Sequence, residues 1–195
     1  YAQAPVGRRM RCIVTPTNFH TAKPGGVAFV GSFRRSHSSF SETIPCWVFN
    51  RSIVGIAEAA SHEIGHTFGL RHDGLLSPWT EYYEGHGGGA GGWAPIMGNS
   101  YYQPVTHWSR GEHSGANNQQ DDVALIASEE NRVSFVGDEA GDTFASAAAL
   151  HAPLGRIGQA GVIAHADVVD LYVFNCVAGT IEVHALPAPF APNLD

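Results

Sequence analysis

The 195-residue chain has few basic residues. Lys and Arg together number 11, against 18 Asp and Glu, and the formal net charge is −7. The basic residues that do cluster form only short groups, at Arg8–Arg11 and at Arg34–Arg35. Proteins that bind nucleic acids need basic surfaces that neutralise phosphates. The composition therefore argues against a nucleic-acid partner.

Long apolar runs are also absent. A membrane-spanning helix needs about 20 consecutive apolar residues, and no stretch of this sequence comes close to that length. We therefore expect no membrane span. The chain starts at Tyr1 without an initiator methionine or an apolar leader segment, which fits a processed or trimmed product.

Cysteine is scarce, with three residues: Cys12, Cys46 and Cys176. None has the C-x-x-C spacing of a redox or zinc-ribbon motif. Cys12 and Cys46 each lie in a short β-like run, so one interpretation is a Cys12–Cys46 disulfide, which would favour an oxidising, extracytoplasmic compartment. The other interpretation is three buried, unpaired cysteines that act as small apolar residues.

Apolar residues make up 44% of the chain, which is enough for a core, and 23 glycines predict much irregular structure. Three short β-like runs precede a long helix: Met10–Thr15, Val27–Phe33 and Cys46–Phe49. The helix is predicted from apolar residues at helical spacing between Ile53 and Phe68, with Ser52 as its cap and Gly69 at its end.

The second half of the chain has less regular patterning. Residues 74–120 predict an irregular, compact lobe, and Asp121–Asn131 predicts a second helix. After about residue 136 the composition shifts, and β-like runs occur at Asp170–Phe174 and Thr180–Val183. The fold class is therefore predicted to be α+β, with one domain over residues 1–135 and a mostly β domain over residues 136–195.

One segment of the predicted long helix carries the chemistry. His62 and His66 are four residues apart, so both rings project from one face of the helix and can bind one cation. Glu63 lies about 100° round the helix, where it can reach a water on that cation. His72 would point away on a continued helix, but Gly69 can adopt the positive φ that lets the chain turn back.

This spacing predicts a catalytic zinc site. Three histidines would hold the ion, a fourth position would stay open for water, and Glu63 would be the general base. The other interpretation is a helix with exposed or core histidines. The extended pattern H-E-x-x-H-x-x-G-x-x-H fixes more positions than the bare H-E-x-x-H, and it favours zinc.

The segment His62–Asp73 resembles the zinc signature of the metzincin metallopeptidases, and the resemblance covers residues 10–135. It implies a two-lobe catalytic domain, with a small mixed sheet and the active-site helix above an irregular lower lobe. Met97, in Ala94–Gly98, would be the methionine of the Met-turn that supports the histidines, and Asp73 would be structural. Some metzincins carry a tyrosine two residues after that methionine, where this chain has Asn99.

The resemblance also implies how a substrate is held. The run that begins with Val27, Ala28 and Phe29 would be the antiparallel edge strand that pairs with an extended peptide. The segment Asn99–His113 would shape the pocket on the primed side of the scissile bond. Its tyrosines and tryptophan suggest an apolar or aromatic lining, without naming a preferred side chain.

The tail resembles a bacterial pre-peptidase C-terminal domain, a small β-sandwich attached to secreted peptidases, present here in part. Three short segments carry that likeness: Asp167, Asp170–Tyr172 and Ala178–Thr180. Asp138 and Asp142 either bind calcium in a loop or serve as turn carboxylates.

The sequence as a whole predicts a secreted, monomeric zinc endopeptidase with one catalytic Zn²⁺ and a protein or peptide substrate. The alternative is a module that binds a surface polymer or glycoprotein through its β tail, with a structural or narrowly specific zinc site. Glu63 discriminates between them, because a structural zinc site has no need of a base.

Overall fold

The structure is a computed structural model that describes residues 9–35, 44–151, 156–163 and 168–186. These residues fall into two compact units, one made of the chain up to Val133 together with Leu186, and one over Ser134–Ala185. The α+β class is confirmed, because helices and small sheets occur together in the first unit. Each unit is described by itself.

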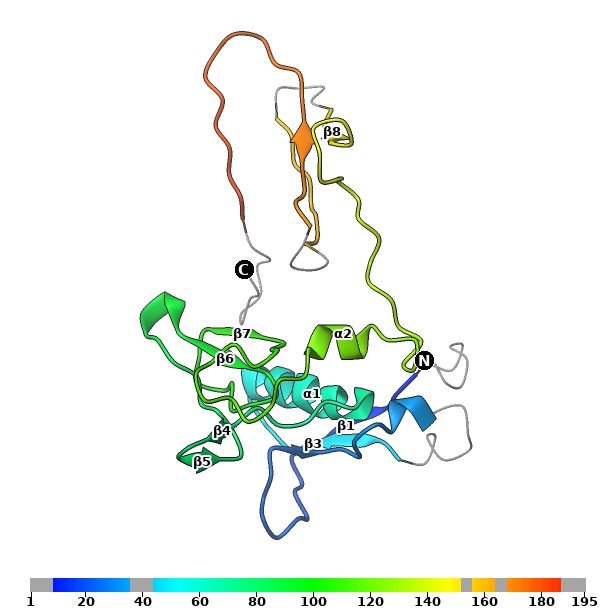
Figure 1. The fold of residues 1–195 in the computed structure, drawn as a ribbon, viewed down its shortest axis with the longest axis vertical. Coiled ribbons are helices and arrows are strands. Elements are labelled where there is room, and N and C mark those ends of the chain that lie inside the picture. Colours follow the sequence, from blue (N-terminus) through cyan, green and yellow to red (C-terminus); the bar gives the residue numbers. More distant parts are fainter. Residues whose placement is uncertain (1–8, 36–43, 152–155, 164–167, 187–195) are drawn as a thin grey trace. The chain divides into compact units, whose positions relative to one another are not determined.

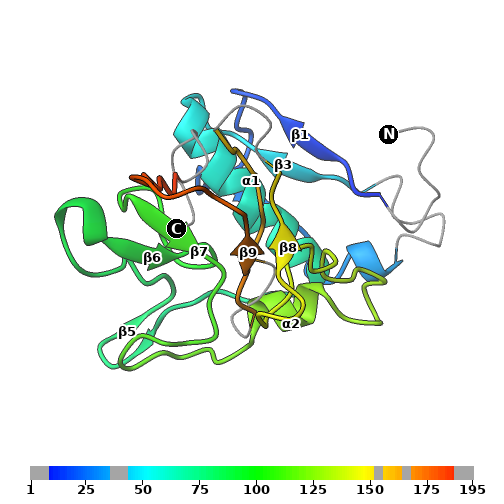
Figure 2. The ribbon, with the colours of Figure 1, turned by 90° about the horizontal axis from the view of Figure 1, so that it is seen from above.

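The first unit opens with a three-stranded sheet that consists of β1 (Cys12–Val14), β2 (Gly26–Val27) and β3 (Cys46–Val48). The strand order is β1-β3-β2. β1 runs parallel to β3, and β2 runs antiparallel to it, so the sheet is mixed. β1 and β3 lie side by side in Figures 1 and 2. Among the described residues, β2 pairs on one side only and is an edge strand.

The strand predicted at Val27–Phe33 is wrong in its extent, because β2 ends at Val27. Gly31 has a φ of 72°, and its N–H donates to the carbonyl of His66 at 2.8 Å. A 3-10 helix, η1 (Phe33–Arg35), follows. The backbone therefore turns toward the long helix where the pattern predicted continued strand.

The two N-terminal cysteines lie directly opposite each other, since Cys12 and Cys46 are register partners in the β1–β3 pair. Both thiols are free in this structure. The Cys46 thiol lies against that of Cys12 and lowers the Cys12 pKa to about 7. The interpretation of three buried cysteines holds only for Cys46, because Cys12 is half-buried and Cys176 is exposed.

The long helix, α1 (Ile53–Phe68), has the predicted bounds. The Ser52 hydroxyl caps it by accepting the N–H of Gly55 at 3.0 Å. The helix packs against the three-stranded sheet, and the two layers enclose the apolar core. The core residues contributed by β3 and its surroundings include Cys46, Val48 and Phe49, with Ala59 from α1.

The chain beyond α1 forms short elements. They are β4 (Leu75–Leu76), β5 (Trp79–Thr80), the 3-10 helix η2 (Gly89–Gly91), β6 (Trp93–Pro95), β7 (Val105–His107) and α2 (Asp122–Ile126). Of these, α2 packs on α1, and α2, β6 and β7 lie on the side of the helix opposite β1 and β3 in Figure 1. The strands have two or three residues each, in keeping with a predicted irregular lobe. α2 is shorter than predicted, because the Asn131 amide donates to the carbonyl of Leu125 and closes the helix early.

The second unit has little regular structure among its described residues. β8 (Ala148–Ala149) and β9 (Tyr172–Val173) form one parallel pair. The strand predicted at residues 180–183 is wrong, since those residues are not in a strand and pair with no described partner. Asp167 lies outside the described residues. A partial β-sandwich therefore stays a prediction.

The Asp138 carboxylate stabilises a turn, because its Oδ1 accepts the N–H groups of Ala140 and Gly141 at 3.0 and 3.2 Å. A calcium site stays a prediction. No described helix has both the length and the apolar character needed to cross a membrane.

Candidate active site

The site begins on α1, which carries His62, Glu63 and His66 on its C-terminal half. The helix ends at Gly69, whose φ is 109°, and whose N–H donates to the carbonyl of His66 at 2.9 Å. The N–H of Leu70 donates back to the carbonyl of Gly65 at 3.1 Å. The chain reverses there and returns His72 to the helix. The ring centroids of His66 and His72 are 4.7 Å apart.

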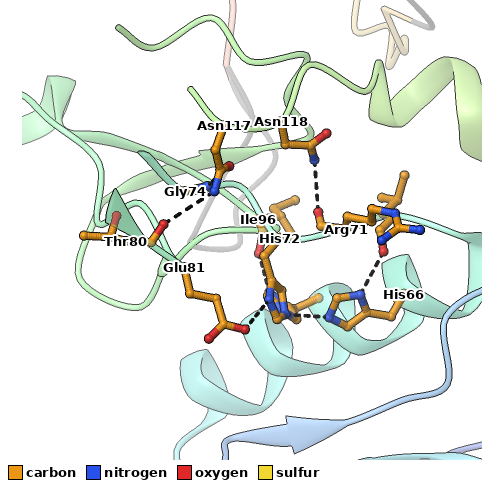
Figure 3. A network of polar contacts seen from close by, with 11 residues as sticks. His66, Arg71, His72, Gly74, Thr80, Glu81, Ile96, Asn117 and Asn118 are labelled. Carbon is orange, nitrogen blue, oxygen red and sulfur yellow. Dashed lines mark hydrogen bonds and ion pairs between the residues drawn. The ribbon is translucent and has the colours of Figure 1, made fainter. Parts of the chain in front are cut away.

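Each of the three imidazoles is fixed through its Nδ1 atom. His62 Nδ1 lies 2.8 Å from the Ile96 carbonyl, and His66 Nδ1 lies 2.9 Å from the Leu70 carbonyl. His72 Nδ1 lies 2.8 Å from Glu81 Oε1, and Figure 3 shows the ring between this carboxylate and His66. Carbonyl and carboxylate oxygens accept hydrogen bonds, so Nδ1 is the protonated nitrogen in each ring and Nε2 keeps a lone pair.

These lone pairs converge. Nε2 of His66 and Nε2 of His72 are 3.0 Å apart, and one ligand nitrogen from each of the three histidines lies within 4.8 Å of the others. Two acceptor nitrogens at that distance repel unless a cation lies between them. Zinc with bonds of about 2.1 Å in tetrahedral geometry separates its ligand nitrogens by about 3.4 Å. The residues present therefore fit a zinc ion with three protein ligands.

Burial keeps the imidazoles neutral, which is the form that binds metal. Desolvation, with smaller contributions from His66 and His72, lowers the pKa of His62 to about 3. Desolvation also lowers the pKa of His66 and of His72, although Glu81 opposes the shift at His72. Protons therefore compete weakly for this cluster at neutral pH.

Glu63 lies against the edge strand. A Cβ built on Gly26 of β2 would stand 2.5 Å from Glu63 Cγ and 2.7 Å from Oε1, so only glycine lets the side chain lie there. Glu63 is buried, and desolvation is the main cause that raises its pKa to about 8, with Cys12 adding to it. A carboxyl with a raised pKa beside a metal site is suited to accept and return protons.

A cavity of about 350 Å³ opens beside His62 and Glu63. Its wall includes the glycines Gly25 and Gly26 of the edge-strand region, Glu58 from α1 and the chain that follows Met97. The lining from that chain is Gly98, Asn99, Ser100, Tyr101 and Tyr102, and Tyr82 also contributes. Its tyrosines match the predicted aromatic lining, whereas the buried acid Glu58 was not expected.

Met97 packs against α1 at Gly65, and Asp73 is hydrogen-bonded to the Met97 backbone. Met97 is fully buried, and its Sδ lies so close to Gly65 that a Cβ there would stand 2.7 Å away. The Asp73 N–H donates to the Met97 carbonyl at 2.9 Å, and its Oδ1 accepts the Asn118 amide at 3.0 Å. Burial raises the pKa of Asp73 to about 6.

The predicted substrate-binding residues do not line the cavity beside His62 and Glu63. Val27, Ala28 and Phe29 line a second cavity of about 370 Å³, together with aromatic residues such as Trp47. Neither the three histidines nor Glu63 line that cavity. The segment that faces Glu63 is instead Gly25–Gly26.

Sequence reasoning missed two residues that hold His72. Glu81 bonds its Nδ1, and the Tyr82 ring lies 4.4 Å from the His72 ring between centroids. They follow His72 by nine and ten residues, after the β4–β5 pair. No helical or strand periodicity connects residues at that separation, so the sequence held no signal for them.

The geometry is that of a three-histidine centre suited to one zinc ion. The sequence model of metallo-peptidase family M12, reprolysin type, matches residues 2–109. This match spans more than half of the chain, and the chain therefore belongs to metallo-peptidase family M12. It is a peptidase in general terms, with a histidine cluster suited to zinc. Neither the curated proteins nor the solved structures contain a significant match.

Proposed function

We propose that the chain is a zinc-dependent endopeptidase in which His62, His66 and His72 hold the metal and Glu63 is the general base. The observation that carries this proposal is the position of Glu63. Its carboxylate lies against the backbone of Gly26 on an open strand edge, and it lines one cavity together with His62. A structural metal site needs neither a base nor an open strand beside it.

The three histidines would hold a zinc ion, which would supply a Lewis acid for water activation and for polarisation of the scissile carbonyl. Glu63 accepts the proton of the attacking water, and it then passes that proton to the leaving amine. Its raised pKa, about 8, suits both transfers near neutral pH. Glu81 holds His72 in the tautomer that presents Nε2 to the metal.

The open edge of β2 supports a role in holding substrate. An extended peptide laid antiparallel to Gly26–Val27 would continue the sheet β1-β3-β2 by one strand. The scissile bond would then lie over Glu63, and the side chain that follows it would enter the cavity of about 350 Å³. Val27, Ala28 and Phe29 would contact the peptide farther along, through the second cavity.

Several expectations from the sequence remain proposals with partial support. The burial of Met97 beneath Gly65 supports a Met-turn role, and the hydrogen bonds of Asp73 support a structural one. An extracellular location rests on the sequence alone, since Cys12 and Cys46 face each other across β1 and β3 as free thiols. A monomeric state, a bound calcium ion and a pre-peptidase C-terminal-like tail rest on the sequence alone.

The alternative, a module that binds a surface polymer or glycoprotein, has no specific feature in its favour among the described residues. The experiment that separates the two hypotheses uses zinc-loaded protein and the variant Glu63→Gln. The variant keeps the shape of the side chain and removes the base. We expect unchanged zinc content and a fall in cleavage of casein and labelled peptides of at least about 100-fold.

A chelator should abolish cleavage by the parent protein, and added zinc should restore it. Cleavage by Glu63→Gln at the parent rate would overturn the proposed role of Glu63. If the parent protein binds zinc but cleaves no peptide in a diverse library, the endopeptidase proposal itself is wrong.

A further inference from the structure

The cavity beside the catalytic centre contains an acidic group that the proposed mechanism does not use. Glu58 lies on α1 one turn before His62, so both residues occupy the same face of the helix. Its side chain lines the cavity, although it is 4% exposed. A carboxylate so deeply buried costs free energy unless a partner compensates it.

The partners that the chain supplies are hydroxyl groups. Ser100 Oγ donates to Glu58 Oε2 at 2.5 Å, and Thr106 Oγ1 donates to Oε1 at 3.1 Å. Both oxygens of Glu58 therefore act as acceptors. The two hydroxyl groups fix the position of the carboxyl group, and neither of them carries a positive charge.

The described residues that line the cavity include no lysine or arginine. Asn99, in the same wall, has an amide oxygen without a hydrogen-bond partner in the described part of the chain. The amide nitrogen of Asn99 donates to Glu84, so its oxygen is available to accept a hydrogen bond from a ligand in the cavity.

The rest of the lining suits a long side chain with a charged end. Tyr82, Tyr101 and Tyr102 contribute aromatic rings, and aliphatic stems of lysine and arginine pack well against such rings while the cationic head reaches a polar partner. A volume of about 350 Å³ admits either side chain. The cavity therefore combines aromatic side chains with a carboxyl group that two hydroxyl groups hold in place.

We propose that Glu58 is a specificity-determining residue that selects peptides with lysine or arginine directly after the scissile bond. This inference rests on the proposed endopeptidase function. The basic side chain enters the cavity beside Glu63, and its head forms a charge-assisted hydrogen bond with Glu58. The C-terminal cleavage product then begins with lysine or arginine.

The test begins with the zinc-loaded parent protein and matched peptides that differ only in the residue after the scissile bond. We expect lysine and arginine to give a kcat/KM about 10–100-fold above norleucine, which has the stem without the charge. Acetyl-lysine, which keeps the aliphatic stem and loses the charge, should lose at least the same factor. Equal rates for lysine, acetyl-lysine and norleucine would overturn the proposal without any variant.

The variant Glu58→Gln then assigns the preference to this residue. It should lower kcat/KM for the lysine peptide about 10-fold or more, with little change for the norleucine peptide. A residue that only ties α1 to Ser100 and Thr106 would slow both peptides by the same factor. Glu129→Gln, which removes the same charge from an exposed position outside the cavity, is the matched control and should keep the parental ratio.

The outcomes separate the two proposals. If the parent cleaves no peptide at all, the endopeptidase function fails. If it cleaves peptides and the library digest shows no basic residue after the bond, the function stands and this inference fails. If the basic preference persists in a folded Glu58→Gln variant, Glu58 is not its source.

Discussion

The Glu81 carboxylate lies 2.8 Å from Nδ1 of His72, on the side of the ring away from His66. His62 and His66 are held by backbone carbonyls, so His72 is the one imidazole of the cluster held by a side chain. The hydrogen-bond partner of His72 can therefore be changed by a side-chain substitution, whereas the partners of His62 and His66 cannot.

The variant Glu81→Gln should weaken zinc binding about 10-fold. The amide keeps a hydrogen-bond acceptor but loses the charge that raises the basicity of the ligand and fixes its tautomer. Competition with a fluorescent chelator measures the zinc Kd. Glu84→Gln is the matched control, since Glu84 is exposed, lies on the same segment and contacts Asn99 rather than a histidine. Equal zinc affinities for the two variants would contradict the role of Glu81.

A second prediction concerns the reversal after α1. Gly69 has a φ of 109°, and an added Cβ would also meet the Arg34 guanidinium. Gly69→Ala should lower the free energy of unfolding by about 1–3 kcal/mol and weaken zinc binding, because the strained turn would displace His72. Denaturant titration and zinc competition measure the two effects.

Gly88→Ala is the control for this variant. Gly88 has an extended backbone with a φ of −155°, and a Cβ there meets no atom within 4 Å. It should change neither quantity appreciably. If Gly69→Ala behaves like Gly88→Ala, the positive φ is not what returns His72 to the site.

The sequence predicted the histidine cluster because its geometry is local. The spacing of His62 and His66 depends on one helical turn, and Gly69 needs only its own backbone freedom. All three features lie within one stretch of eleven residues that ends at His72. The bounds of α1 were predictable for the same reason, since Ser52 and Gly69 act on adjacent turns.

What the sequence did not predict depends on contacts between distant segments. β2 stops at Val27 because Gly31 bonds to the carbonyl of His66, 35 positions farther along the chain. Glu81 reaches His72 only once the β4–β5 pair has folded. Glu58 lines a cavity together with Gly98 and the four residues that follow it, which lie 40 or more positions farther along the chain. Periodicity carries no information about such pairings.

A third prediction tests the packing of Met97 under the helix. A Cβ on Gly65 would stand 2.7 Å from Met97 Sδ and 3.0 Å from Cζ3 of Trp108. Alanine favours a helix over glycine by about 1 kcal/mol, but overpacking in a buried site costs about 1–3 kcal/mol. Gly65→Ala should therefore be neutral to destabilising, whereas an unhindered site would gain stability.

A double-mutant cycle with Met97→Leu isolates the contact, because leucine is shorter and withdraws from the added methyl group. The loss in the double variant should be smaller than the sum of the two single losses by at least about 0.5 kcal/mol. Additive losses in denaturant titrations would mean that Met97 does not set the space beneath Gly65.

The last prediction concerns pH and Asp122, the fully buried first residue of α2. Its Oδ2 accepts the Ser109 N–H at 3.0 Å, and its Oδ1 has no partner among the described residues. Burial is the main cause that raises its pKa from 3.8 to about 7, with Asp73 among the acidic neighbours that add to the shift. The folded protein therefore binds a proton at this carboxyl more tightly than the unfolded chain does.

Because the folded pKa is the higher one, the stability that Asp122 contributes is complete below about pH 4 and is lost as the pH rises through about 7. Asp122→Asn stays neutral and should escape this loss. Relative to the variant, the parent should lose about 1–3 kcal/mol between pH 4.5 and pH 8 in urea titrations of metal-free protein. Glu129→Gln, which removes one acidic charge at an exposed position and is not among the groups that shift the pKa of Asp122, should follow the parent curve. If Asp122→Asn also follows the parent curve across this range, the buried carboxyl does not carry the proton assigned to it.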